Sequence, residues 1–196
     1  WMNLYMRKIY EYCKLKYVQV VLKDYKNVKY GGGTDRGYLL LQKYLANKKL
    51  PIIIVRPFNY TGPHHSNCFV VPKIVWHFAK KIPTISLGNM DVIREVNSID
   101  FVTESYYRLL VSKEVVNGIF NICSGKGYSI MDILNLLKDM TGFKINFLQD
   151  ALLKRSAEIH SLVGCDKKFT NYLGMVNKIS LDQSLMEMYR FVKNQP

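Results

Sequence analysis

Apolar residues along this chain fall into short continuous runs and longer amphipathic stretches. The clearest run is residues 51–55 (PIIIV), in which three β-branched isoleucines predict a strand buried on both faces. We expect the strand to end at Arg56-Pro57, because proline has no N–H to donate to a neighbouring strand. A polar loop over residues 59–65 follows at the carboxyl end of the strand, where open α/β sheets bind ligands. An ordinary core strand with a polar loop fits the same pattern.

The rest of the chain alternates strands with helices. Strands are predicted over residues 17–22, 51–55, 117–124 and 144–148. Helices are predicted over residues 3–15, 35–48, 67–81, 100–113, 130–140, 166–173 and 180–192. Ser129 and Asp132 have the spacing of a helix cap, and Gly142 predicts where that helix ends. Gly88-Asn89 predicts a hairpin-like turn. The alternation indicates an α/β fold with a parallel sheet.

Composition narrows the class of protein. The chain has 196 residues, of which 48% are hydrophobic, so one compact unit with a sizeable core is expected. No apolar run approaches the roughly 18 residues of a membrane span. The four cysteines are scattered without a CxxC pair, which favours reduced thiols over disulfides and predicts no metal site. A cytoplasmic protein without membrane contact is therefore expected.

The net charge of +13 suggests an anionic partner. Nucleic acid, a membrane surface and a phosphorylated small molecule are all candidates. The lysines are spread along the whole chain, which favours solvated faces over a binding patch. A basic nucleic-acid-binding domain stays an alternative that rests on charge alone, because the sequence has no helix-turn-helix, zinc or RNP-type signature.

Four segments carry a resemblance to a known family. Residues 56–63 (RPFNYTGP) resemble the RPFNHTGP-type segment of the extended short-chain dehydrogenase/reductase family of nucleotide-sugar epimerases, dehydratases and reductases. Arg94-Glu95-Val96 stands where relatives have Arg-Asp-Phe, and residues 117–124 (NGIFNICS) resemble the GxxYNVCSG segment of the reductases. Residues 152–164 (LLKRSAEIHSLVG) resemble the LRPxEVxxLxG segment of the GDP-sugar reductases and dehydratases.

The resemblance covers residues 50–190 and implies a partial Rossmann-like sheet. Residues 1–60 would be a remnant of that sheet, and residues 61–196 a small α/β portion that binds a nucleotide sugar. A single compact unit is expected. The implied activity is hydride transfer between NAD(P) and C4 of a GDP-linked 4-keto-6-deoxy sugar. A homodimer is also implied, because relatives often pair through two long helices.

The resemblance also implies roles for particular residues. Tyr30 would be the catalytic acid/base, and Arg56 and Pro57 would lie beside the cofactor. The implied substrate-binding residues are Asn59, Phe69, Val70, Lys73, Arg94, Arg155 and Glu158. A guanidinium fork suits diphosphate oxygens, and a carboxylate suits the two hydroxyls of a ribose. The segment at Phe69 fits a core turn and helix equally well, and Arg155 with Glu158 fits a helix ion pair.

Two features argue against full activity. Thr34 stands where the family's Tyr-x-x-x-Lys pair has its lysine, so the charge that lowers the tyrosine pKa is missing. Residues 1–60 also contain no glycine-rich strand–turn–helix for a dinucleotide pyrophosphate, which counts against NAD(P) binding. The chain begins with Trp1 rather than methionine. A truncated or degenerate family member is expected, with a non-catalytic nucleotide-sugar-binding protein as the alternative.

Overall fold

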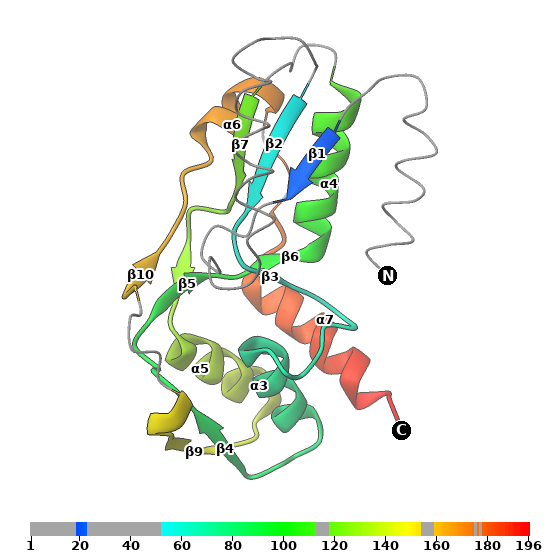
Figure 1. The fold of residues 1–196 in the computed structure, drawn as a ribbon. Coiled ribbons are helices and arrows are strands. Elements are labelled where there is room, and N and C mark those ends of the chain that lie inside the picture. Colours follow the sequence, from blue (N-terminus) through cyan, green and yellow to red (C-terminus); the bar gives the residue numbers. More distant parts are fainter. Residues whose placement is uncertain (1–18, 23–51, 113–117, 154–158, 175, 177) are drawn as a thin grey trace.

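The computed structural model describes residues 19–22, 52–112, 118–153, 159–174, 176 and 178–196 (Figure 1). Its strands are β1 Gln19–Leu22, β2 Ile52–Pro57, β3 Tyr60–Thr61, β4 Thr84–Leu87, β5 Ile93–Glu95, β6 Asn97–Ser98, β7 Gly118–Ile122, β8 Gly127–Tyr128, β9 Asn146–Gln149 and β10 Ser161–Leu162. Its helices are α3 Val70–Ala79, α4 Ile99–Val111, α5 Ile130–Thr141, the 3₁₀ turn η1 Ala151–Leu153, α6 Lys167–Leu173 and α7 Leu181–Lys193.

The largest described sheet confirms the predicted α/β architecture. Its strand order is β1-β2-β7, and both pairs are parallel. Ile53, Ile54 and Val55 are buried, as expected for a central strand. The predicted end of this strand at Arg56-Pro57 is confirmed, because β2 ends at Pro57, which lies opposite Ile122 at the last rung. A proline is tolerated there because the ladder ends with it.

Two hydrophobic clusters organise the described residues. One joins the sheet to α4 and α6 through Ile53, Phe101, Leu109, Phe120 and Phe169. The other joins α3, α5, α7 and β4 through Ile74, Phe78, Ile85, Leu137 and Leu185. Figure 1 shows the sheet and α4 in the upper part of the molecule and α3, α5 and α7 in the lower part. The proposed division of the chain at residue 60 stays a prediction.

The predicted cap of α5 is confirmed. Ser129 Oγ accepts a hydrogen bond from Asp132 N at 3.0 Å, and Asp132 Oδ2 accepts one from Ser129 N at 2.8 Å. The helix ends at Gly142, whose φ of 69° lies in the left-handed region that favours glycine. Local sequence signals therefore define this helix at both ends.

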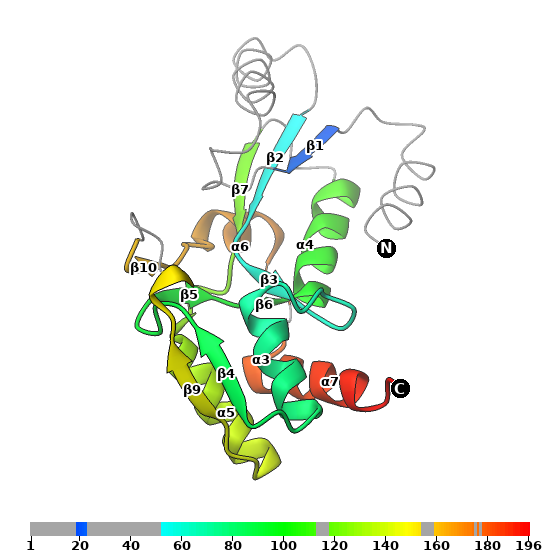
Figure 2. The same cartoon turned by 60° about the horizontal axis from the view of Figure 1, so that its bottom comes forward.

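The segment around Gly88-Asn89 folds differently from the prediction. It does not close a hairpin, because the strands on either side belong to different sheets. β4 pairs in parallel with β9, whereas β5 pairs with β10 in parallel and with β8 in antiparallel orientation. Figure 2 shows β4 and β9 side by side in front of α5. The predicted helices over residues 3–15 and 35–48 lie outside the described residues.

Candidate functional site

The first turn of α3 presents two exposed apolar side chains beside a lysine. Phe69 is the N-cap residue and is 57% exposed, and Val70 is 42% exposed. Lys73 Nζ donates a hydrogen bond to the carbonyl oxygen of Ser86 in β4 at 2.7 Å. This bond fixes the start of α3 against the end of β4. The predicted contacts of these side chains with a nucleotide base stay a prediction.

The end of β4 also contacts the turn η1. Asp150 N donates to the carbonyl oxygen of Leu87 at 2.8 Å. A Cβ at Gly88 would lie only 2.6 Å from the carbonyl oxygen of Leu153, so this close approach of two backbones requires glycine. Leu152 and Leu153 are exposed on η1. The end of β4 is thus bordered by the first turn of α3 and by η1.

Arg94 lies in the middle strand of the small sheet β10-β5-β8. Its side chain is half-buried, and its Nη1 donates to the carbonyl oxygens of Ile93 at 2.8 Å and His160 at 3.3 Å. Ile93 N in turn donates to His160 O at 2.8 Å. Because the guanidinium is tied to the backbone just before β10, its position depends on how β10 is held against β5.

Arg155 and Glu158 lie outside the described residues, and so do Tyr30 and Thr34. The described chain on either side of the first pair is η1 and β10. These two elements contact the end of β4 and the strand β5, respectively. The two ends of the segment that carries Arg155 and Glu158 therefore lie beside the end of β4, to which Lys73 donates, and beside β5, which carries Arg94. The roles of all four residues stay predictions.

Asn59 follows the carboxyl end of β2 and has an exposed side chain. Its carbonyl oxygen accepts from the backbone N of Asn97 at 2.9 Å and from Asn97 Nδ2 at 3.1 Å. Arg56 and Pro57 occupy the last rungs of β2, opposite Asn121 and Ile122. They lie at the carboxyl edge of the parallel sheet, where α/β folds bind ligands.

The described residues do not by themselves fit a dinucleotide cofactor. A pyrophosphate needs backbone N–H groups from a glycine-rich turn at a helix N-terminus. Within the described ranges, the carboxyl edge of the parallel sheet consists of Arg56 and Pro57 at the end of β2 and the loop that follows β7. None of these is such a turn. Likewise, the described part of the chain contains no cluster of three metal-ligating side chains.

Glu95 was not singled out by the sequence analysis, yet it has the densest hydrogen bonding at the site. Its side chain is 1% exposed. Oε1 accepts from Gly164 N at 2.6 Å and Gly125 N at 3.2 Å. Oε2 accepts from Ser124 N at 2.8 Å, Ser124 Oγ at 3.3 Å and Asn97 Nδ2 at 3.2 Å. Its place beside Arg94 in the family motif was the only sequence signal for it.

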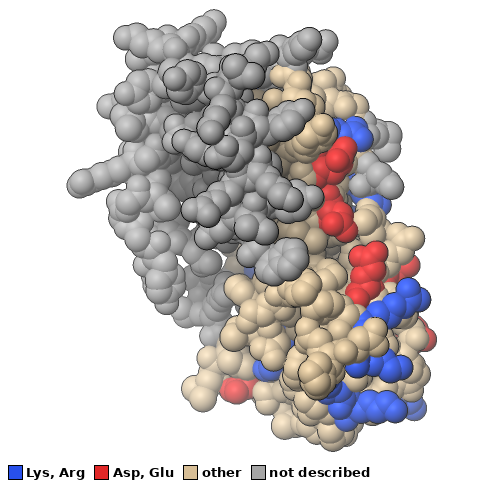
Figure 3. All heavy atoms as spheres, turned by 90° about the vertical axis from the view of Figure 1, so that its right-hand side faces the viewer, with Lys and Arg blue, Asp and Glu red and all other residues tan. Residues whose placement is uncertain are grey.

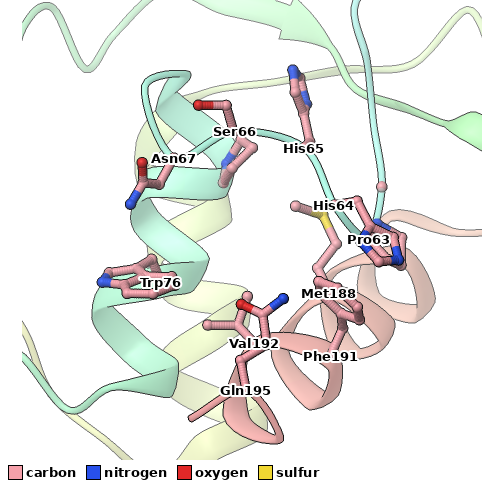
Figure 4. Close-up of a pocket in the computed structure, with 12 residues that line it drawn as sticks. Pro63, His64, His65, Ser66, Asn67, Trp76, Met188, Phe191, Val192 and Gln195 are labelled. Carbon is pink, nitrogen blue, oxygen red and sulfur yellow. The ribbon is translucent and has the colours of Figure 1, made fainter. Parts of the chain in front are cut away.

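A separate pocket of about 310 Å³ lies between the loop after β3, helix α3 and helix α7. Figure 4 shows Trp76 projecting from α3, and Met188 and Phe191 from α7. The His64 ring lies 4.0 Å from the Phe191 ring, centroid to centroid. Nδ1 of His65 forms a hydrogen bond with Thr61 Oγ1 at 3.2 Å. Burial lowers the pKa of His65. None of the predicted site residues that the structure describes lines this pocket.

The parallel sheet, its covering helices and the polar edges of its strands define a Rossmann-like α/β protein. Comparison with known proteins is more specific. The model of the NAD dependent epimerase/dehydratase family matches residues 24–123, about half of the chain. The chain therefore belongs to the NAD-dependent epimerase/dehydratase family, which confirms the resemblance inferred from the sequence motifs.

Two curated relatives match over most of this chain. GDP-6-deoxy-D-talose 4-dehydrogenase of Aggregatibacter actinomycetemcomitans is 36% identical over 140 residues, which are 71% of this chain and 47% of the relative. GDP-6-deoxy-D-mannose reductase of Pseudomonas aeruginosa is 27% identical over 139 residues, which are 68% of this chain and 45% of the relative. The chain thus spans about half the length of the curated relatives it matches.

A solved structure supports the same fold. A Burkholderia cenocepacia protein described as an epimerase superposes with a TM-score of 0.79 at 30% sequence identity. The match covers 91% of this chain and 64% of the Burkholderia protein. The relatives and the fold agree on the family, and they leave the activity of this chain to be proposed.

Proposed function

We propose that this chain is the nucleotide-sugar-binding portion of an NAD(P)-dependent oxidoreductase that acts at C4 of a GDP-linked 4-keto-6-deoxy sugar. The observation that carries the proposal is the placement of Arg94. Arg94 lies on β5, and its Nη1 donates a hydrogen bond to the carbonyl oxygen of His160, just before β10. His160 follows the segment that carries Arg155 and Glu158 in the sequence. The names of both curated relatives describe enzymes of GDP-linked 6-deoxy sugars, which supports GDP as the nucleotide.

The proposed roles follow from the chemistry of each side chain. Phe69 and Val70 offer exposed apolar surface to the base, with Lys73 behind them. Arg94 supplies N–H donors to the diphosphate, since a guanidinium binds phosphate oxygens through two parallel bonds. In the same scheme, Arg155 contacts the nucleotide and Glu158 accepts from the ribose hydroxyls. Asn59 contacts the sugar side, and Tyr30 is the acid/base.

A non-catalytic nucleotide-sugar-binding protein is the second candidate. Thr34 favours it, because threonine supplies no positive charge beside Tyr30. A nucleic-acid-binding domain is less well supported. Figure 3 shows basic side chains gathered on the lower part of one face but acidic side chains directly above them, so the field on this face is mixed. No helix in the described ranges has the length and apolar character that a membrane span needs.

A thermal-shift titration of the chain with GDP, UDP, CDP and NADPH tests the proposal. A ligand that binds only the folded chain stabilises it by about 2.7 kcal/mol at one hundred times its Kd. We expect GDP to raise the midpoint most. If NADPH raises it as well, the expectation from the sequence that NAD(P) binding is lost is wrong. If no nucleotide raises it, the chain shares the fold of the family without its ligand, and the proposed site is wrong.

Arg94→Gln makes the test specific. Losing one charge-assisted hydrogen bond weakens binding by roughly tenfold to a hundredfold. Arg108→Gln removes the same charge from α4, where Arg108 pairs with Glu104 at 2.8 Å in the other half of the described structure. GDP affinity is expected to fall in the Arg94 variant and to stay within twofold in the Arg108 variant. Equal losses in both would show that only net charge matters.

Location and assembly are part of the proposal. The described cysteines Cys68, Cys123 and Cys165 are free thiols, which supports the cytoplasm as the location. A homodimer is proposed from the family resemblance. Size-exclusion chromatography with light scattering at several protein concentrations tests it, and a mass of one chain throughout would contradict it.

A further inference from the structure

A buried carboxylate links the segments that carry the predicted nucleotide ligands. Glu95 accepts hydrogen bonds from backbone N–H groups of Ser124 and Gly125 in the β7–β8 turn and of Gly164 after β10. Asn97 Nδ2 donates both to Glu95 Oε2 at 3.2 Å and to Asn59 O at 3.1 Å. One carboxylate thus reaches three backbone segments directly and a fourth through Asn97.

This arrangement has a physical cost that only complete hydrogen bonding offsets. A carboxylate removed from water is strongly destabilising unless donors replace its hydration. Here both oxygens of Glu95 receive at least two donors each. Because the donors come from segments about 30 and 69 residues away in sequence, the carboxylate sets the distance between those segments. Moving any one of them leaves a buried negative charge with fewer donors.

We propose that Glu95 is a positioning residue of the nucleotide site, which rests on the proposed function. Arg94 precedes it on β5, and its Nη1 also bonds to His160 just before β10. The bond from Gly164 to Glu95 fixes the chain just after β10. Glu95 therefore holds the carboxyl end of β10 against β5. In this proposal, the pairing of β10 with β5 keeps the Arg94 guanidinium in place for the diphosphate.

A second link supports a positioning role over a purely local one. Lys178 Nζ donates to the carbonyl oxygen of Ser124 at 3.2 Å and pairs with Asp166. The turn whose amides face Glu95 is therefore held from its other side, by the segment that leads into α7. Lys178 therefore adds a second restraint on this turn beside the hydrogen bonds to Glu95.

Glu95→Gln is the sharpest perturbation, since it keeps the shape of the side chain. An amide has one acceptor oxygen, and its NH₂ group would face N–H donors that need an acceptor. We expect the GDP Kd, measured by calorimetry well below the unfolding midpoint, to rise by about tenfold, the factor that one hydrogen bond to a charged group supplies. Leu109→Ala is the control, because it removes buried surface of α4 without touching this network.

A double-mutant cycle with Arg94→Gln separates positioning from general destabilisation. If Glu95 acts through Arg94, adding Glu95→Gln to the Arg94 variant changes the GDP Kd less than twofold, because coupled residues are not additive. Equal factors in both backgrounds overturn the proposal. Guanosine, which lacks the diphosphate, is expected to bind the wild-type chain and the Glu95 variant within twofold of each other.

The remaining outcomes separate this proposal from the proposed function. If the wild-type chain binds GDP and the Glu95→Gln chain binds it equally well, only the role of Glu95 is wrong. If the wild-type chain binds neither GDP, UDP nor CDP, the proposed function fails and the role of Glu95 with it. Should Glu95→Gln not fold, Glu95→Asp replaces it in the same cycle, because the charge is kept and the reach is one methylene shorter.

Discussion

Gly164 lies two residues after β10, at the end of residues 152–164, the segment that carries the predicted nucleotide ligands Arg155 and Glu158. A Cβ at this position would lie 2.7 Å from Cys123 Sγ, 2.7 Å from Phe58 Cζ and 2.8 Å from Cys123 Cβ. Cys123 is fully buried behind β7. The amide of Gly164 donates to Glu95 at 2.6 Å. We predict that Gly164→Ala destabilises the chain strongly, because the added methyl group has no space and the peptide cannot retreat without breaking that hydrogen bond.

The expected magnitude follows from two separate costs. Carbon and sulfur atoms in contact normally lie well beyond 3 Å, so the backbone or its neighbours must shift by several tenths of an ångström. Overpacking of this kind costs about 1–3 kcal/mol. A buried carboxylate that loses one donor costs about 1–3 kcal/mol more. Together they predict that the free energy of unfolding falls by roughly 2–6 kcal/mol, and that nucleotide binding weakens with it.

Urea unfolding followed by circular dichroism measures this change, with Cys123→Ala as the second arm. Removing Sγ eliminates one of the shortest contacts, so the double variant is expected to be less destabilised than the sum of the two single changes. The contacts with Phe58 and with the Cβ of residue 123 remain, so recovery is partial. If Gly164→Ala unfolds within about 0.5 kcal/mol of the wild-type chain, as an ordinary surface change would, the tight packing of Gly164 on Cys123 and Phe58 is refuted.

Two further predictions concern single side chains. Ser129→Ala removes the hydroxyl that caps α5 and should cost about 1 kcal/mol in urea unfolding. Hydrogen bonds from the backbone N–H and the hydroxyl of Ser129 lower the pKa of Asp132. This pair therefore stabilises the fold above the ordinary carboxyl pKa and its contribution is lost as the pH falls, so a stability difference between Asp132→Asn and the wild-type chain that stays constant as the pH falls would contradict it. Burial raises the pKa of Cys123 to about 12, so iodoacetamide at pH 8 should modify Cys68 and Cys165 in the native chain but Cys123 only after unfolding, as peptide mass spectrometry would show.

Local signals were sufficient where the structure is local. The apolar run before Arg56 predicted a buried central strand, because three consecutive β-branched residues fit few other environments. The cap at Ser129 and the glycine at 142 predicted α5, because both signals act within one helical turn. The parallel sheet followed from the order of these elements. For the strand and the helix, residues within about ten positions of one another determine the conformation.

The small strands could not be predicted in the same way. β5 and β10 have three and two residues, and they pair across a gap of 68 positions, from Ile93 to Ser161. No turn signal connects strands that are so far apart. The hairpin predicted at Gly88-Asn89 was wrong for this reason, since β4 found its partner in β9 instead of in the strand just after the turn. Glycine was needed there for contact with η1, not for a hairpin.

Glu95 shows why the candidate site was only partly predictable. In the sequence it reads as a charged residue in a short strand, and most glutamates are exposed. Its burial becomes favourable only when the β7–β8 turn and the chain after β10 bring their amides to it, and neither segment is near it in sequence. Residues that bind a ligand carry a motif, whereas a residue that assembles the site from distant segments is visible only in the fold.

The bonds that position the proposed nucleotide contacts can be considered separately from the proposed catalytic residues. The proposed nucleotide contacts at Lys73 and Arg94 are fixed by bonds to Ser86 and His160, and the network of Glu95 adds backbone bonds of its own. All of these bonds lie within the described residues. We predict that a change at Glu95 weakens nucleotide binding while Tyr30 and Thr34 are left unchanged. A variant that loses GDP binding through Glu95 would show that the nucleotide half of the site has an internal framework of its own.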